Sequence, residues 1–203
     1  MPMNYLIFSD IHGSQTACEK AISFYDKFDC NKIIILGDIL YHGPRNPLPQ
    51  GYNPKGTIEI LNKYAQNIFC CRGNCDSEVD QMVLNFQISA DFIQLFDSKF
   101  EIFCTHGHIY APILKNGEKP QGCESAQKTP KIKSPYIFFY GHTHIPILEN
   151  HNGSIICNPG SVSLPKENSQ ASFAVLQTKG GNNSNNRITL YNINGNELKN
   201  LTF

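Results

Sequence analysis

The 203-residue sequence predicts one mixed domain, spanning residues 1–203, with an α/β first half and a second half richer in β-strand. Two patterns predict this class. In the first half, short apolar runs alternate with segments of helical periodicity, as they do in βαβ units. In the second half, one apolar run follows another with turn residues between them. Hydrophobic residues make up 40% of the chain and charged residues 17%, which is typical of globular proteins.

The first half is expected to alternate strands with helices. Apolar runs predict strands over Asn4 to Ser9, Lys32 to Leu36 and Ile68 to Cys71. Apolar residues at helical spacing predict helices over Ser14 to Phe28 and around Ile58 to Ala65. A third, short helix is expected to begin near Asp76, with Asp76 as its N-cap. The segment from Tyr41 to Pro54, rich in Pro, Gly and Asn, is expected to be a loop.

The second half is expected to be mostly strand. The apolar runs that predict these strands are Phe92 to Phe96, Phe100 to Thr105, Tyr136 to Tyr140, Ile145 to Glu149, Ser154 to Cys157, Phe173 to Gln177 and Ile188 to Ile193. The segment from Lys115 to Ser134 is polar and contains Gly and Pro, so we expect a mobile loop there.

The charge balance bears on partners and location. Lys plus Arg and Asp plus Glu both number 17, so the chain lacks the basic excess that long nucleic acids or anionic membranes attract. No basic signal-peptide region precedes the first apolar run, and no run approaches the roughly 20 apolar residues of a membrane span. We therefore expect a cytoplasmic protein without a membrane partner. The eight cysteines include no CxxC pair, and we expect them to be reduced thiols, mostly in the core.

Polar side chains follow five of the predicted strands. Because residues just past the carboxyl ends of strands meet in one crevice of an α/β sheet, we expect these side chains to converge. They are two aspartates, one asparagine and several histidines: Asp10, His12, Asp38, Asn74, His106, His108, His142 and His144. A lone Asp-x-His or Gly-Asp pair is usually turn chemistry, so the prediction depends on the joint pattern.

This set of side chains suits a metal centre. Imidazole and carboxylate ligands together fit Mn, Fe, Co, Ni or Zn. Seven protein donors exceed what one ion can use, whereas two ions sharing a carboxylate would use them all. Such a pair can clamp an in-line displacement at phosphorus and generate hydroxide near neutral pH. Two divalent ions outweigh two carboxylates and a hydroxide in charge, so the site is expected to select an anion such as a phosphate ester.

At these residues the sequence resembles a known family. The ordered motifs Asp10-Ile-His12, Gly37-Asp38, Gly73-Asn74, His106 and Gly141-His142-Thr-His144 are similar to those of the calcineurin-like metallophosphoesterase superfamily. Longer stretches, including Gly73-Asn-Cys-Asp-Ser-Glu-Val-Asp80 and Asn158-Pro-Gly-Ser161, resemble the bacterial YfcE-type phosphodiesterases. The resemblance implies a four-layer αββα sandwich in which two mixed β-sheets are flanked by helices.

The resemblance also implies an activity and a ligand set. One ion would be held by Asp10, His12, Asp38 and His144, and a second by Asp38, Asn74, His106 and His142, with Asp38 as the bridge. Manganese is the expected metal, with Fe, Zn, Ni or Co as alternatives. A hydroxide bridging two ions would attack a small phosphodiester in line. Many members of the family self-associate, so a homo-oligomer is expected.

The sequence departs from the family pattern at two points. Many members carry Asp-Arg where this chain has Tyr41-His42, so the phosphate contact falls to His42 or to Arg45. Many members also have a histidine, thought to protonate the leaving group, where this chain has Cys75. We predict that Asp38, Asn74, Cys75 and His42 act in catalysis. Substrate contacts are expected from His42, Arg45, Asn74 and His108, although His108 is equally compatible with a plain loop residue.

Other functions compete with this prediction. The first is a non-catalytic scaffold of the same fold, like a subunit of the eukaryotic retromer. That subunit has lost part of the metal-ligand set, which is intact in this chain. A phosphomonoesterase is the second. A structural zinc site built from Cys70, Cys71 and Cys75 with a histidine is the third, but the spacing fits no zinc-finger pattern.

Overall fold

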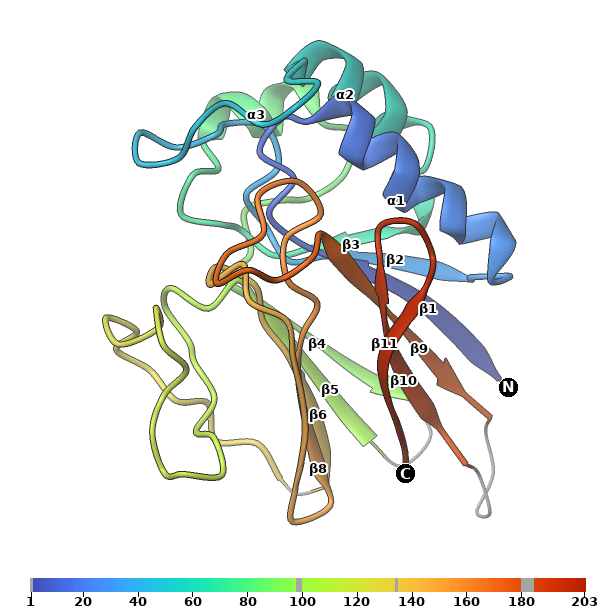
Figure 1. Ribbon diagram of the computed structural model, residues 1–203, viewed down its shortest axis with the longest axis vertical. Coiled ribbons are helices and arrows are strands. Elements are labelled where there is room, and N and C mark those ends of the chain that lie inside the picture. The colour runs from blue at the N-terminus through green and yellow to red at the C-terminus, as the bar shows by residue number, and fades with distance from the viewer. Residues whose placement is uncertain (1, 98–99, 134, 180–184) are drawn as a thin grey trace.

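The computed structural model describes residues 2–97, 100–133, 135–179 and 185–203 and contains two β-sheets stacked face to face (Figure 1). Six strands form the first sheet, in the order β11-β10-β9-β1-β2-β3, and five form the second, in the order β4-β5-β6-β8-β7. The strands are β1 (Met3–Phe8), β2 (Lys32–Ile35), β3 (Ile68–Cys70), β4 (Phe92–Asp97), β5 (Phe100–Thr105), β6 (Tyr136–Phe139), β7 (Ile147–His151), β8 (Ser154–Asn158), β9 (Ser172–Thr178), β10 (Arg187–Asn192) and β11 (Glu197–Thr202).

Both sheets mix parallel and antiparallel strands. Strands β1, β2 and β3 are parallel, as are β5, β6 and β8, whereas β9–β11 in the first sheet and the edge strands β4 and β7 in the second run antiparallel to their neighbours. The carboxyl ends of the two parallel sets carry the loops that form the site described below. This arrangement confirms the predicted pair of mixed β-sheets, and the few helices lie over the first of them.

The alternation of side chains along each strand explains the layers. Leu6 and Phe8 of β1 pack beneath the helices, whereas Tyr5 and Ile7 of the same strand pack between the two sheets. In β6, Phe139 faces the space between the sheets and Phe138 faces the opposite side. Because both faces are buried, these strands are continuously apolar, which is why they stand out in the sequence.

Helices α1 (Gln15–Lys27) and α2 (Pro54–Asn62) lie over the outer face of the first sheet (Figure 1). Ser14 caps α1 by accepting a hydrogen bond from the amide of Ala17 at 3.2 Å. Asn53 caps α2, with Pro54 at its first position, where a missing amide costs no helical hydrogen bond. Helix α2 ends at Asn62, earlier than the predicted end at Ala65, and Ala65–Asn67 form a separate 3₁₀ turn, η1.

The start of helix α3 (Glu78–Val83) differs from the prediction. Its N-cap is Ser77, which forms a capping box with Asp80, and not Asp76. The Asp76 carboxylate instead accepts the backbone amides of Asp38 and Ile39 in the loop after β2, and that of Gly73 earlier in its own loop. Both residues are good capping residues, and the choice between them depends on contacts that are distant in the chain.

Irregular chain covers the outer face of the second sheet. Within the segment predicted as a mobile polar loop, from Lys115 to Ser134, Cys123 and Ala126 are buried against Phe138 and Tyr140. Ser134 itself lies outside the described residues. These buried side chains attach the segment to the second sheet, although its composition is mostly polar.

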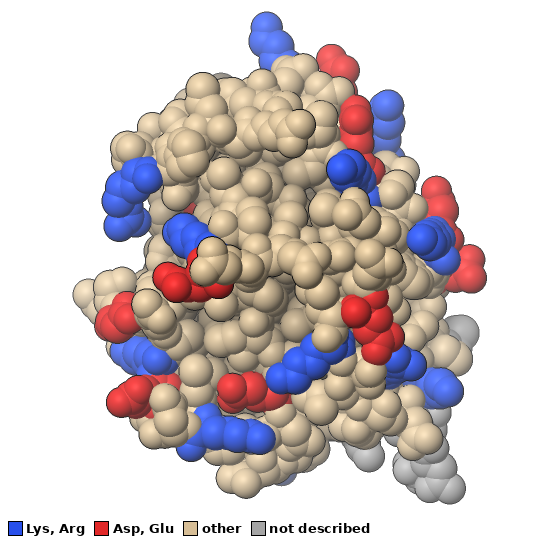
Figure 2. All heavy atoms as spheres, in the orientation of Figure 1, with Lys and Arg blue, Asp and Glu red and all other residues tan. Residues whose placement is uncertain are grey.

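No helix of the described residues is long and apolar enough to cross a membrane. Cationic and anionic side chains are interspersed over the face drawn in Figure 2, without a stripe of one sign. This mixture agrees with the net charge of zero.

Candidate metal centre

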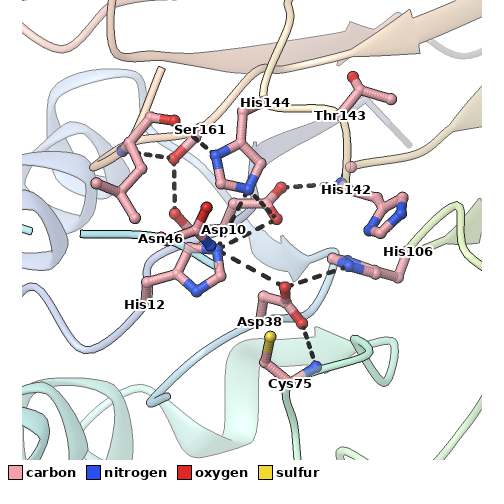
Figure 3. Close-up of polar contacts among 12 residues, drawn as sticks. Asp10, His12, Asp38, Asn46, Cys75, His106, His142, Thr143, His144 and Ser161 are labelled. Carbon is pink, nitrogen blue, oxygen red and sulfur yellow. Dashed lines mark hydrogen bonds and ion pairs between the residues drawn. The ribbon is translucent and has the colours of Figure 1, made fainter. Parts of the chain in front are cut away.

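The predicted ligands come from loops that follow the parallel strands of both sheets. Asp10 and His12 follow β1, Asp38 follows β2 and Asn74 follows β3, all in the first sheet. From the second sheet, His106 follows β5, while His142 and His144 follow β6. Figure 3 shows six of these side chains, all but that of Asn74, gathered in one place. The structure thus brings the seven predicted residues together across the two sheets.

The backbone at this site is strained. Five non-glycine residues adopt positive φ angles, namely Asp10 (56°), His12 (50°), Asp38 (55°), His142 (69°) and His144 (60°). Left-handed conformations are uncommon outside glycine and cost free energy that surrounding contacts must offset. Nine non-glycine residues among those described have positive φ angles, and five of them are these predicted ligands, so much of the left-handed backbone lies where the side chains converge.

Hydrogen bonds from the backbone fix the orientation of three imidazoles. Nδ1 of His12 lies 2.8 Å from the carbonyl oxygen of Tyr41, Nδ1 of His106 lies 2.7 Å from that of Leu36, and Nδ1 of His144 lies 2.6 Å from that of Leu164. A carbonyl oxygen only accepts, so Nδ1 donates in each pair. In the neutral ring Nε2 therefore carries a lone pair, which is the tautomer that a metal ligand needs.

These lone pairs point at other electron-rich atoms. Nε2 of His12 lies 3.3 Å from Nε2 of His144, and Nε2 of His144 lies 3.2 Å from Oδ1 of Asp10. Among the described residues, this buried Oδ1 has no hydrogen-bond partner. Acceptors that face one another in a buried space repel unless a cation lies among them. Asp10, His12 and His144 therefore fit a divalent cation.

A second cluster of acceptors adjoins the first through Asp38. Its Oδ2 atom lies 3.7 Å from Nε2 of His12 and 3.5 Å from Nε2 of His106. On the far side, Nε2 of His106 lies 3.1 Å from Oδ1 of Asn74, and the His142 ring is 5.0 Å away. The donor set thus fits two cations with Asp38 between them, although the assignment of each ligand stays a prediction.

The charges at the centre show the same need for cations. Burial alone would raise the pKa of Asp38, but the neighbouring imidazoles, His106 above all, hold it at about 2. Burial would likewise lower the pKa of His106, yet the Asp38 carboxylate raises it to about 10. Burial and the charge of His106 lower the pKa of His142 to about 4, which leaves it neutral. Without metal, the His106 imidazole is therefore protonated, and its positive charge offsets the negative charge of the Asp38 carboxylate.

The segment after β8 holds two of the ligand loops. Oγ of Ser161 donates to the carbonyl oxygen of Asp10 at 2.7 Å, which supports that residue in its left-handed conformation. The side-chain amide of Asn158 donates to the carbonyl oxygen of Gly141 and to Oγ1 of Thr143, on either side of His142. The Asn158-Pro-Gly-Ser161 motif thus has a positioning role that the sequence left unassigned.

A pocket of about 360 Å³ opens over the centre. It is lined by predicted residues, including Asp38, Arg45, Asn74 and Cys75, and also by Lys166, a cation that the sequence analysis missed. Lys166 belongs to no motif, and only the return of the chain beside His144 brings it to the pocket. The 115–134 segment contributes Gln121 and Gly122 to the rim.

Neither of the two histidines predicted to contact substrate, His42 and His108, is among the residues that line this pocket. His42 packs edge-on against the rings of Tyr41 and Tyr52, and its backbone carbonyl accepts from the side chain of Asn46. His108 lies beside the rings of His106 and His142, where burial and those imidazoles lower its pKa to about 4. Their predicted substrate contacts stay predictions.

The cysteines form no disulfide. All eight are free thiols, of which seven are buried and Cys75 is partly exposed at the pocket. The amide of Cys75 donates to Oδ1 of Asp38 at 2.8 Å, so its backbone helps to orient the residue shared by the two clusters. Burial and the charge of Asp38 raise the pKa of the Cys75 thiol, so it stays protonated.

Comparisons with known proteins agree with this geometry. The chain is 40% identical over 174 residues to phosphodiesterase YfcE of Escherichia coli K12, covering 86% of this chain and 87% of that protein. A solved structure of the E. coli phosphoesterase YfcE matches with a TM-score of 0.83 at 36% identity, covering 98% of each chain. Vps29 of Chaetomium thermophilum matches with a TM-score of 0.60 at 14% identity over 99% of this chain and 98% of its own, a likeness of fold alone.

The family itself is matched over most of the chain. Residues 3–181 match the model of the calcineurin-like phosphoesterase superfamily domain. This match and the 40% identity to YfcE confirm the resemblance noted in the sequence motifs. The chain therefore belongs to the calcineurin-like phosphoesterase superfamily.

Proposed function

We propose that the protein is a metal-dependent phosphodiesterase that hydrolyses a small phosphodiester. The observation that carries this proposal is the pair of acceptor clusters joined by Asp38, in which imidazole lone pairs face carboxylate and amide oxygens at 3.1–3.7 Å. The name of its E. coli relative, phosphodiesterase YfcE, supports the same reaction class.

In this proposal Asp10, His12, Asp38 and His144 hold one divalent ion, and Asp38, Asn74, His106 and His142 hold the other. When bound, such ions supply a hydroxide nucleophile near neutral pH and neutralise charge that develops on the phosphoryl oxygens. The backbone carbonyls that accept from the imidazole Nδ1 atoms keep the ligands oriented. Manganese is the metal that we propose, on the family resemblance.

The pocket above the clusters supports a small anionic substrate. Arg45 and Lys166 line it and place two cations beside the site, where they would bind the phosphate or its substituents. A volume of about 360 Å³ suits a small molecule more than a polymer. The absence of a net positive charge further disfavours long nucleic acids.

Cys75 lines the same pocket and is proposed to contact the leaving group. In the metal-free site, burial and the charge of Asp38 raise the pKa of its thiol, and we propose that it is a weaker acid than the histidine of many relatives. We also propose His42, in the loop after β2, and His108, in the loop after β5, as substrate contacts, on the family resemblance.

The test is an activity screen of metal-stripped protein resupplied with Mn²⁺, Fe²⁺, Co²⁺, Ni²⁺ or Zn²⁺. Bis(p-nitrophenyl) phosphate represents diesters and p-nitrophenyl phosphate represents monoesters. We expect Mn²⁺ to restore diester hydrolysis best and Asp38→Asn to abolish it, because that variant removes the shared carboxylate. Preferential monoester hydrolysis would make the protein a phosphomonoesterase, and metal binding without any hydrolysis would favour the scaffold.

We further propose that the protein is cytoplasmic and self-associates. Exposed apolar side chains on α3 support self-association: Val79 is 66% exposed and Met82 is 83% exposed. Light scattering coupled to size exclusion tests the oligomer, and replacing Met82 with Glu should shift the mass toward that of the monomer if this face is used.

A further inference from the structure

Asp76 lies in the loop after β3 and outside the predicted ligand set, yet its carboxylate contacts the loop after β2 as well as its own loop. Its Oδ2 accepts the amide of Asp38 at 2.9 Å and the amide of Gly73 at 2.7 Å. Its Oδ1 accepts the amide of Ile39 at 2.8 Å. One carboxylate thus joins the loop after β2 to the loop after β3.

These two loops touch without intervening side chains. A Cβ atom on Gly73 would lie 2.1 Å from Oδ1 of Asp38 and 2.3 Å from its amide nitrogen. A Cβ atom on Gly37 would lie 2.5 Å from the amide nitrogen of Gly73. Glycine at both positions therefore permits the close approach, but glycines by themselves supply no attraction. Hydrogen bonds between the loops supply it: two amides of the loop after β2 donate to the Asp76 carboxylate, and the amide of Cys75 donates to Oδ1 of Asp38.

The contact also bears on the strained residue. Asp38 has a φ of 55°, and its amide and the next amide along the chain both donate to Asp76. Left-handed residues persist only where neighbouring contacts outweigh their cost. A charged acceptor gives stronger hydrogen bonds than a neutral one, so a carboxylate suits this position.

A plain capping role does not explain these contacts. The cap of α3 is Ser77. Its hydroxyl accepts the amide of Asp80, and the Asp80 carboxylate accepts the amide of Ser77, which together form a capping box. The three amides that Asp76 accepts lie outside α3. Asp76 and Asp80 therefore offer a matched pair, because the two carboxylates are four residues apart and only one touches the ligand loops.

We propose that Asp76 is a positioning residue for the metal centre, holding Asp38 and Asn74 in the arrangement that binds both ions. This inference rests on the proposed function and extends it to a side chain that touches neither metal nor substrate. The expected size follows from other metalloproteins, where loss of a group that orients a ligand costs about 10- to 100-fold in metal affinity or activity.

The first experiment compares Asp76→Asn with Asp80→Asn by hydrogen exchange of backbone amides, observed by NMR on metal-free protein. The Asn side chain presents an NH₂ group in place of one oxygen, so at least one of the three amides loses its acceptor. We expect faster exchange at Asp38, Ile39 or Gly73 in Asp76→Asn, with strand amides unchanged. Asp80→Asn should leave these three amides protected.

The second experiment measures Mn²⁺ affinity by calorimetry in the wild type and both variants. We expect Asp76→Asn to bind about 10- to 100-fold more weakly and Asp80→Asn to bind within twofold of the wild type. If Asp76→Asn unfolds, Asp76→Glu replaces it with the same expectation, because it keeps the charge but moves both oxygens by one methylene.

The outcomes separate the two proposals. Normal binding by the wild type with equal binding by the Asp76 variant would overturn only the positioning role. Equal losses in the Asp76 and Asp80 variants would overturn it as well, since that pattern indicates general destabilisation. No metal binding by the wild type would overturn the proposed function itself.

Discussion

At the scale of single residues, Cys75 shows how one substitution changes the chemistry that the fold can offer. It lines the pocket where many relatives carry a histidine, and its thiol pKa is raised by burial and by Asp38. A neutral thiol with a high pKa protonates a leaving group poorly near pH 7. Esters whose leaving groups depart as stable anions need no such help.

We therefore predict a steep dependence of the rate on the leaving group. Wild-type protein should hydrolyse aryl phosphodiesters much faster than alkyl ones, and Cys75→His should narrow that ratio by about tenfold or more, within the ~10²–10⁴-fold range of general acid catalysis. Cys75→Ser is the control, since it removes the thiol without adding a titratable group. Equal wild-type rates for both ester classes would show that proton donation does not limit the reaction.

At the residue scale, the convergence of the ligand candidates could be predicted from the sequence, and their roles stay predictions. The seven ligand candidates were identified because Asp, His and Asn directly after apolar runs are conspicuous. Lys166 was not, because a single lysine in a polar loop has no signature and reaches the pocket only through tertiary contacts. The bridging contacts of Asp76 were hidden in the same way, behind an ordinary capping position.

At the scale of elements, the loops after the strands are held in strained conformations by chain that arrives much later. Ser161 and Ser163, in the loop after β8, both donate to the carbonyl oxygen of Asp10, at 2.7 and 3.0 Å. Ser161 also accepts two amides, those of Ser163 and Leu164, and is fully buried. The loop after β1 is thus held by a segment about 150 residues away.

Both serines donate to the same carbonyl, but only Ser161 also accepts amides, so the two residues make a matched test. Ser161→Ala removes one of the two hydroxyl donors to the Asp10 carbonyl and leaves the amides of Ser163 and Leu164 without their acceptor, so we expect the free energy of unfolding to fall by about 1–3 kcal/mol. Ser163→Ala removes a single donor from a shared acceptor and should cost less, about 1 kcal/mol or below. Urea unfolding of both variants checks this order, and equal losses would contradict the central role of Ser161.

Element boundaries were predicted where the strands are apolar and missed where they are not. Strand β11 was not expected at all, because five of its six residues are exposed and its sequence, ELKNLT, is mostly polar. It pairs only with β10 at the edge of the first sheet. Backbone pairing without burial leaves no periodic apolar pattern, so such an edge strand is invisible to hydrophobic periodicity.

At the scale of the whole molecule, the core and the metal centre are separate. Tyr5, Ile34 and Ile102 belong to the cluster buried between the sheets, whereas the ligands lie in loops past the strand ends. The fold was predictable at this scale because apolar runs identify the strands and the motifs at their ends carry the family resemblance. The pairing of two sheets around one site was implied by the resemblance and not by periodicity.

This separation predicts that the fold survives loss of metal. Chelation with EDTA should leave the far-UV circular dichroism unchanged and lower Tm. A ligand present at 100 times its Kd adds about 2.7 kcal/mol of stability, and each kcal/mol corresponds to about 2–4 °C for a chain of this size. A protein that unfolds on chelation would show instead that metal is part of the core structure.

The central claim is that the residues gathered at the strand ends hold two divalent ions that share Asp38. The most direct measurement is an anomalous difference map from crystals loaded with Mn²⁺, recorded near the manganese absorption edge. We expect two peaks about 3.5–4 Å apart, one among Asp10, His12 and His144 and one among Asn74, His106 and His142, with Asp38 between them. A single peak, or peaks away from these side chains, would contradict it.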